Sequence, residues 1–161
     1  MTATTPFLKR AETLGPLASR YVEVESLPWK PTPCPGIDMK ILLEDPESGL
    51  LTALFRWQPG AELALHEHVE IEQTFVLEGS LVDDEGEVHA GNYVWRPKGN
   101  RHIARSPRGA LVLSMFLKPN IFLAGEPDQG RHIVVLAHLV APLETAGLAA
   151  LQDNEDRKSV V

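Results

Sequence analysis

Three histidines and one glutamate have the residue types and spacing of a metal site. His66 and His68 are two residues apart, and side chains two apart on a β-strand project from the same face. Glu72 follows His68 closely, and His102 lies on a later segment. Imidazole suits iron, zinc, nickel and copper, and a carboxylate extends the choice to manganese. Four such ligands on an ion that accepts six would leave two positions for water, a substrate or dioxygen.

The meaning of these residues depends on the elements that position them, because a lone His-x-His pair usually lies on an exposed strand. Short apolar runs separated by glycine-centred turns recur about every ten residues between residues 39 and 117. This spacing predicts an all-β sandwich or barrel. One of the predicted strands, at residues 74–78, ends at Gly79-Ser80. The strand with His66 and His68 and the later strand with His102 could then meet inside it.

The chain length predicts a single domain over residues 1–161. Residues 1–36 form an N-terminal arm whose proline-rich part, 27–36, runs extended with Trp29 as its large anchor. The barrel occupies about residues 37–120, and a C-terminal extension occupies 121–161. Within that extension we expect a further strand at 133–140 and a short helix at 142–152.

The composition excludes several classes of protein. The net charge is −7 and basic blocks are lacking, which argues against a nucleic-acid partner. The single cysteine, Cys34, excludes an internal disulfide framework and a cysteine-rich zinc site. A signal-peptide core and a run of 18 apolar residues are both lacking, so we expect a cytoplasmic protein without a membrane partner.

The same residues also fall into a known frame, and the sequence resembles the cupin superfamily over about residues 39–118. The first cupin motif comprises Gly60, His66, His68, Glu72 and Gly79, and the second comprises Gly91, Pro97, Gly99 and His102. The usual closing asparagine of the second motif is Ser106 here. The resemblance implies a double-stranded β-helix, or jelly-roll barrel, with a metal held by His66, His68, Glu72 and His102. It also implies a homodimer or higher homo-oligomer.

A narrower resemblance links the chain to the cupin domain of ChrR-type anti-sigma factors and to small acetylacetone-cleaving, non-heme iron dioxygenases. The segments that carry it include Pro28-Trp29, Pro35-Gly36-Ile37, Gln58-Pro59-Gly60, Phe75-Val76-Leu77-Glu78-Gly79 and Ala90-Gly91-Asn92-Tyr93. ChrR-type proteins carry a zinc-bearing helical domain before the cupin, and this N-terminus has no Cys/His set. The acetylacetone-cleaving enzymes use three histidines without a carboxylate, so Glu72 departs from their pattern.

Three functions are consistent with these patterns. The first is a non-heme iron dioxygenase, with Fe²⁺ as the favoured ion and Zn²⁺, Mn²⁺ or Ni²⁺ as alternatives, that acts on a small diketone-like or other chelating carbonyl compound. The second is a non-catalytic, ChrR-like sensor or ligand-binding cupin. The third is a metal-assisted isomerase or hydrolase. The sequence indicates no catalytic residue beyond the metal ligands.

The walls of the pocket are less defined by the pattern. Alternation places Arg56 on the outside of its strand, and it places Tyr93 and Trp95 together on a face of the core or of an interface. Met115 lies in a run that is apolar on both faces, so we expect a strand buried on both sides with Met115 as a candidate pocket wall. The acidic cluster at residues 83–85 is expected to form a solvated turn.

Overall fold

A computed structural model describes residues 3–8, 15–124 and 132–135. These residues form antiparallel strands, and the short 3₁₀ turn η2 (Val24–Ser26) is the helical element among them. The strands are β1 (Lys30–Pro31), β2 (Ile37–Asp45), β3 (Leu50–Trp57), β4 (Ala61–Glu67), β5 (Glu72–Val82), β6 (Glu87–His89), β7 (Tyr93–Arg96), β8 (Arg101–Ser106), β9 (Ala110–Phe116), β10 (Ile121–Ala124) and β11 (His132–Val135). The all-β prediction is therefore confirmed.

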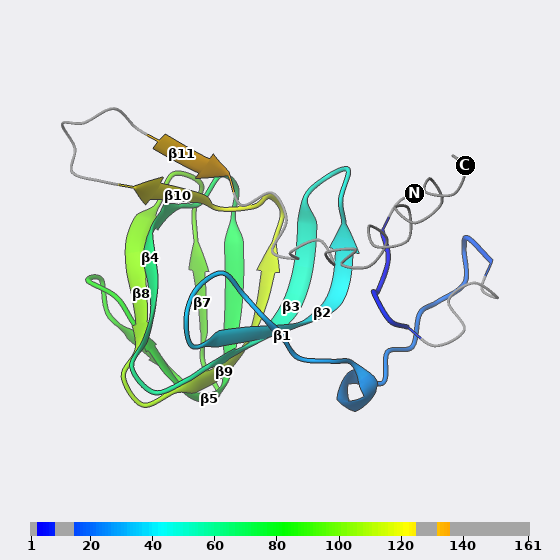
Figure 1. Ribbon diagram of the computed structural model, residues 1–161, viewed down its shortest axis with the longest axis horizontal. Coiled ribbons are helices and arrows are strands. Elements are labelled where there is room, and N and C mark those ends of the chain that lie inside the picture. Colours follow the sequence, from blue (N-terminus) through cyan, green and yellow to red (C-terminus); the bar gives the residue numbers. More distant parts are fainter. Residues whose placement is uncertain (1–2, 9–14, 125–131, 136–161) are drawn as a thin grey trace, which may run out of the picture.

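The strands form two facing halves of one curled sheet. One half runs β1-β2-β3-β9-β5 with β7 at its edge, and the other contains β8, β4, β10 and β11 with β6 paired to the end of β5. Figure 1 shows β4 and β8 at one side and β2 and β3 at the other. The pairing of β4 with β8 places His66 directly opposite His102, so the fold brings together two histidines that are far apart in the sequence.

Strand β5 belongs to both halves and bends between them at Gly79. Its first part pairs with β9 as far as Gly79↔Ala110, and its last three residues pair with β6. The φ angle of Gly79 is +69°, and a Cβ atom there would lie 2.0 Å from the Gly109 carbonyl oxygen. The sequence pattern predicted that this strand would end at Gly79-Ser80. That prediction was wrong, because glycine here allows a bend within one strand.

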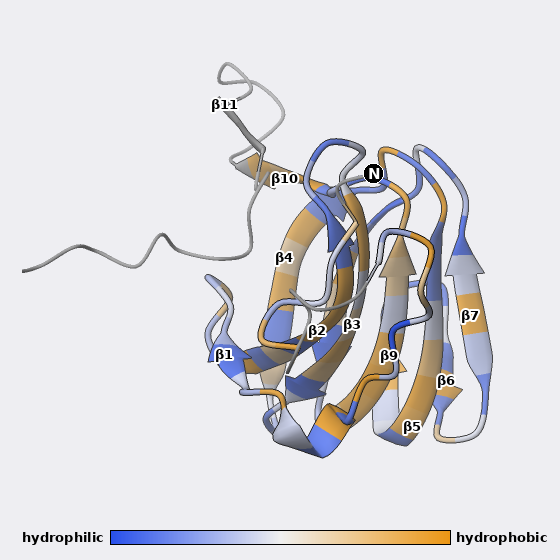
Figure 2. Ribbon diagram, turned by 90° about the vertical axis from the view of Figure 1, so that its right-hand side faces the viewer, coloured by the Kyte–Doolittle hydropathy of each residue, from blue (hydrophilic) through white to orange (hydrophobic). Residues whose placement is uncertain are grey.

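The core lies between the two halves and consists of inward-facing residues such as Met39, Ala53 and Val112. Figure 2 shows hydrophobic and hydrophilic residues alternating along the strands. On β9, Val112 and Ser114 are buried, whereas Leu113 and Met115 are only partly buried. The expectation that this strand is buried on both sides was therefore wrong, since its outer side is only partly covered.

The N-terminal arm contacts the β2 edge of the sheet, where Thr4 bonds to Glu44 through the backbone and Leu27 is buried. Strand β1 adds two residues to the edge of β2. The Lys40 ammonium donates to the Val24 carbonyl oxygen (3.0 Å), and the Arg56 guanidinium stacks 4.3 Å from the centre of the Trp29 ring. Trp29 therefore anchors the arm, as the sequence predicted. The expected helix at 142–152 and the end of the expected strand at 133–140 lie outside the described residues.

Candidate metal centre

The backbone around the three histidines explains the two motifs of the sequence. His66 stands near the end of β4, opposite His102 on β8. His68 lies just beyond β4, where its N–H donates to the Asn100 carbonyl oxygen (3.0 Å) and its carbonyl oxygen accepts from the Gly99 N–H (2.7 Å). The Gly99 φ angle of +82° makes this loop glycine-dependent. The loop before β8 therefore fixes the backbone at His68 as well as leading to His102.

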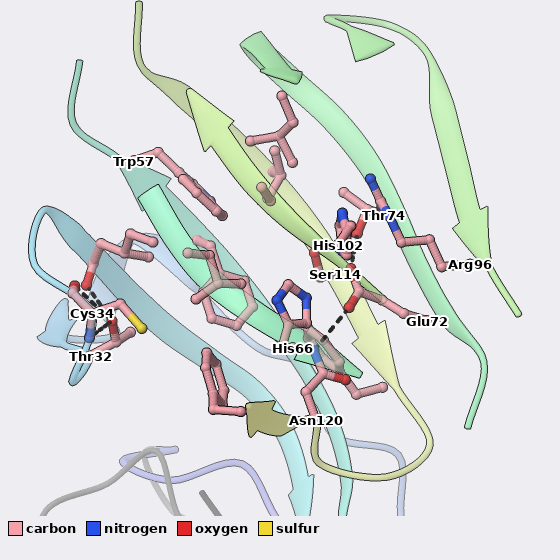
Figure 3. Close-up of a pocket in the computed structure, with 18 residues that line it drawn as sticks. Thr32, Cys34, Trp57, His66, Glu72, Thr74, Arg96, His102, Ser114 and Asn120 are labelled. Atoms are coloured by element: carbon pink, nitrogen blue, oxygen red, sulfur yellow. Dashed lines mark hydrogen bonds between the residues drawn. The ribbon is translucent and has the colours of Figure 1, made fainter. Parts of the chain in front are cut away.

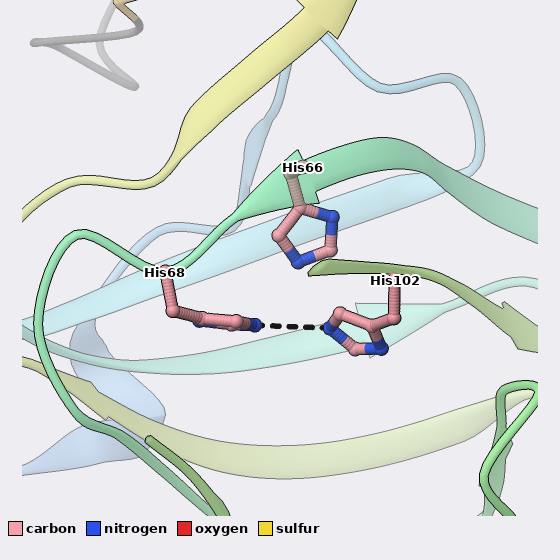
Figure 4. A group of neighbouring side chains, drawn as sticks. All are labelled: His66, His68 and His102. Carbon is pink, nitrogen blue, oxygen red and sulfur yellow. Dashed lines mark hydrogen bonds between the residues drawn. The ribbon is translucent and has the colours of Figure 1, made fainter. Parts of the chain in front are cut away.

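The three imidazole rings converge in the interior (Figure 4). His66, His68 and His102 are 1%, 0% and 7% exposed. One nitrogen of each ring can be chosen so that all three nitrogens lie within 4.8 Å of one another. The Nε2 atoms of His68 and His102 are 3.0 Å apart. Among the described residues, these three histidines form the group that could hold a metal ion.

Each imidazole has an oxygen close to its Nδ1 atom. The contacts are His66 with the Ala64 carbonyl oxygen (2.8 Å), His68 with Glu72 Oε2 (3.1 Å) and His102 with Asp83 Oδ2 (3.0 Å). The His68–Glu72 contact is too poorly aligned to count as a hydrogen bond. For His66 and His102, an acceptor at Nδ1 favours the tautomer with the ring proton there and a lone pair on Nε2, which is the arrangement found around metal-ligating histidines.

Burial keeps two of the three imidazoles, those of His66 and His102, in their neutral form. Desolvation lowers the pKa of His66. Desolvation, together with the positive charge of Arg96, lowers the pKa of His102 to about 4. Neutral imidazole is the form that binds metal ions, so the two rings need not release a proton before they coordinate at neutral pH.

Glu72, the fourth expected ligand, lies beside the histidine cluster and not within it. Its Oε1 atom accepts from Thr74 Oγ1 (3.0 Å), and its Oε2 atom accepts from Asn120 Nδ2 (3.3 Å). Burial raises the pKa of this carboxyl, but the contact with His68 and the charge of Arg96 outweigh burial and lower the pKa to about 2. Glu72 is therefore an ionised carboxylate next to the three imidazoles.

Two further residues complete the surroundings of the site, and the sequence analysis did not identify either. The Asp83 side chain is 8% exposed and contacts His102, and Arg96 Nη2 donates to Asp83 Oδ2 (2.7 Å). The expectation of a solvated turn at residues 83–85 was therefore wrong for Asp83. A signal for Arg96 did exist, because the alternation that exposes Tyr93 and Trp95 on β7 turns Arg96 inward.

The donor set fits a metal ion. Two nitrogen ligands about 2.1 Å from one ion lie about 3.0 Å apart if they are at right angles and about 3.4 Å apart in a tetrahedron. The 3.0 Å separation of His68 Nε2 and His102 Nε2 matches the right-angled case. Without an ion, this 3.0 Å contact is a hydrogen bond in which one of the two nitrogens carries a proton. With both ring protons at Nδ1, both lone pairs would be free for a cation, so the residues present suit a divalent ion.

A small pocket opens onto the histidines (Figure 3). Its volume is about 80 Å³, several times the ~10–15 Å³ that holds one water molecule, so it suits a molecule of only a few heavy atoms. Polar groups gather at the metal end, and aliphatic and aromatic side chains such as Phe55, Val112 and Phe116 line the rest. The arm supplies Thr32 and Cys34 on the side away from Glu72 and Arg96. Neither Met115 nor the exposed residues Tyr93 and Trp95 line this pocket, so the expectation for Met115 was wrong.

Two facing halves of a curled antiparallel sheet, with three buried histidines between them, define the cupin class, the double-stranded β-helix. The chain belongs more specifically to the ChrR cupin-like domain family, whose model matches residues 17–120. No match was found among curated protein sequences.

Solved structures with similar folds include two acetylacetone dioxygenases. A candidate acetylacetone dioxygenase from Methylibium petroleiphilum is 26% identical, with a TM-score of 0.65 over 75% of this chain and 91% of that chain. The acetylacetone dioxygenase of Acinetobacter johnsonii is 23% identical, with a TM-score of 0.63 over 72% of this chain and 86% of that chain.

The anti-sigma factor ChrR of Rhodobacter sphaeroides, in complex with SigE, is also similar. It is 22% identical, with a TM-score of 0.50 over 58% of this chain and 51% of that chain.

Among the described residues, no helix has the length and hydropathy needed to cross a membrane.

Proposed function

We propose that this protein is a metal-dependent dioxygenase that acts on a small diketone-like or other chelating carbonyl compound. The observation that carries the proposal is the convergence of three buried imidazoles, two of which, those of His66 and His102, line a small and mostly apolar pocket. The likeness to the Methylibium petroleiphilum protein, which extends over most of both chains, supports the same reaction class. Fe²⁺ is the proposed ion, with Zn²⁺, Mn²⁺ and Ni²⁺ as alternatives.

In this proposal His66, His68 and His102 hold the ion through Nε2, and Glu72 is the fourth ligand. To coordinate, the Glu72 carboxylate must exchange its contact with His68 Nδ1 for the ion. The variants E72Q and E72A test this role. A ligand role predicts weaker metal binding in both variants, whereas a role confined to orienting His68 predicts that E72Q, which still offers an oxygen, binds nearly as well as wild type.

The charges around the site favour a ligand with one negative charge. When bound, the ion would supply Lewis acidity toward a chelating oxygen pair and, as iron, redox chemistry toward dioxygen. Glu72 and Asp83 contribute two negative charges and Arg96 one positive charge, so a divalent ion leaves the site with one net positive charge. An enolate of a 1,3-diketone has the single negative charge that balances it. Apolar side chains exclude water from the remainder of such a ligand.

Anaerobic loading with Fe²⁺, followed by oxygen-electrode measurements over a panel of 1,3-diketones that includes acetylacetone, tests the proposal. We expect oxygen consumption that depends on substrate, together with cleavage of the diketone. His89→Ala is a matched control, because this histidine is exposed and lies outside the cluster. Absence of turnover with every chelating carbonyl would refute the dioxygenase. Turnover without oxygen, using zinc or nickel, would instead indicate an isomerase or hydrolase.

The family match favours a second candidate, a ligand-sensing domain without catalysis. This candidate predicts that the metal-loaded protein binds a chelating ligand without turnover. It also predicts that a pull-down with this protein recovers one defined protein partner. For both candidates we propose a cytoplasmic homodimer or higher homo-oligomer.

A further inference from the structure

The two oxygens of the Asp83 carboxylate have different contacts: one lies in a turn, and the other lies at the candidate metal centre. Oδ1 accepts from the backbone N–H groups of Glu85 (2.9 Å) and Gly86 (3.0 Å) and so closes the turn after β5. Oδ2 contacts Arg96 Nη2 (2.7 Å) and His102 Nδ1 (3.0 Å). The side chain is 8% exposed, so solvent cannot easily replace these contacts.

We propose that Asp83 is a positioning residue that fixes the tautomer and orientation of His102. By accepting the Nδ1 proton, Oδ2 keeps the Nε2 lone pair of His102 directed at the other two imidazoles. This inference rests on the proposed metal site and adds a residue to it that the cupin motifs do not contain. Metal-ligating histidines commonly depend on such an oxygen at their second nitrogen.

Arg96 holds the Asp83 carboxylate in this place. Its side chain is also 8% exposed, and it stands opposite Glu72 across the β5–β7 pairing. The guanidinium contacts Asp83, and its positive charge also lowers the pKa of Glu72, the carboxyl beside His68. Because a guanidinium only donates hydrogen bonds, it orients Asp83 and offers no lone pair to compete for the ion.

The variant Asp83→Asn separates the two roles of the side chain. Its amide oxygen can still accept from the N–H groups of Glu85 and Gly86, so the turn can be kept. With that oxygen in the turn, the NH₂ group stands where Oδ2 stood, faces the Arg96 donor as well, and cannot accept from His102. The imidazole must accept at Nδ1 instead and carry its proton on Nε2, which removes the lone pair needed for the ion.

The first test uses the metal-free protein. Long-range ¹H–¹⁵N NMR spectra of protein labelled with ¹⁵N-histidine report which ring nitrogen carries the proton. We expect His102 to carry it on Nδ1 in the wild type and on Nε2 in Asp83→Asn. The matched control is Asp84→Asn, which makes the same charge change in the same turn at a side chain that is 91% exposed. A wild-type His102 protonated on Nε2 would overturn the inference without any variant.

The second test is a titration with Co²⁺, followed through its visible absorption. We expect Asp83→Asn to bind about 10–100-fold more weakly than the wild type, and Asp84→Asn to bind within twofold of it. Circular dichroism of the metal-free variants checks the fold. Equal affinity of a folded Asp83→Asn and the wild type would overturn the positioning role. Failure of the wild type to bind any ion would instead refute the metal centre, and the NMR result would still decide the role of Asp83.

Discussion

Replacing Gly79 by alanine should disrupt the bend on which both halves of the sheet depend. The added Cβ would lie 2.0 Å from the Gly109 carbonyl oxygen and 3.0 Å from Ala110 Cα. The first distance is about 1 Å shorter than the limit that real Cβ atoms respect. Since both neighbours are backbone atoms of the β9 end, the pairing of β5 with β9 must shift to make room.

The expected cost follows from three contributions. A non-glycine residue at positive φ costs about 1–2 kcal/mol. Forcing a new carbon against backbone costs about 1–3 kcal/mol, and one broken ladder hydrogen bond adds about 1 kcal/mol. The sum is about 3–6 kcal/mol, which is a large part of the ~5–15 kcal/mol stability of a typical domain. For a chain of this length, we expect the Tm to fall by about 6–24 °C.

Gly91→Ala is the matched control, because Gly91 has a similar φ of +80° but nothing within 4 Å of its Cβ position. It should cost only the backbone strain and lower the Tm by less than about 5 °C. Thermal unfolding of both metal-free variants by circular dichroism measures the difference. Equal shifts for the two variants would refute the reasoning.

Because Gly79 joins the segment with Glu72 to the segment before Asp83, its variant should also bind Co²⁺ more weakly.

Three further predictions concern the buried polar groups. In a Co²⁺ titration, His66→Ala should remain folded and lose more than the ~100-fold in affinity that loss of a residue hydrogen-bonded to a ligand costs. The control, His89→Ala, should bind Co²⁺ normally. Unfolding of His66→Ala would mean that the ring is structural. Arg96→Met should lower the free energy of unfolding in urea by about 3–5 kcal/mol, because it leaves the buried Asp83 carboxylate without its positive partner. Lys98→Met, at an exposed ion pair, should lower it by less than about 1 kcal/mol. Similar losses for the two variants would contradict this prediction. The pKa of His102 falls from 6.5 to about 4 on folding, so the unfolded metal-free chain binds a proton first as the pH falls. The stability from this ring is complete above pH 6.5 and is lost toward pH 4, by about 2 kcal/mol after allowance for solvent screening. Urea midpoints that are unchanged over this range would contradict the assignment.

The sequence predicted the all-β fold and the convergence of the three histidines because both depend on short-range rules. Alternation along a strand placed His66 and His68 together, and the spacing of the motif glycines matched the turns. It failed at Gly79, because glycine serves equally in a turn and in a bend within a strand. The distinction depends on the close approach of Gly109, which is a long-range contact that spacing does not reveal.

The sequence also gave no reason to connect Asp83 with His102. An acidic run before a glycine usually forms a solvated turn, and the side chain of Asp83 does close such a turn. Its second oxygen is buried only because β7 brings Arg96 over it and β8 brings His102 beside it. The prediction that Met115 lines the pocket was wrong for a related reason, since an apolar run does not show which side of its strand faces the interior.

Thr32 and Cys34 line the pocket from the N-terminal arm. The shape of the pocket and the binding of the ion therefore depend on different segments of the chain. All the side chains that gather around the proposed ion come from the strands and turns after Trp57, whereas one wall of the chamber is built by a peripheral ribbon, the N-terminal arm. Substitutions in that ribbon can reshape the chamber without disturbing the ion-binding residues. Homologues with identical histidines but different leading segments should therefore accept differently shaped compounds.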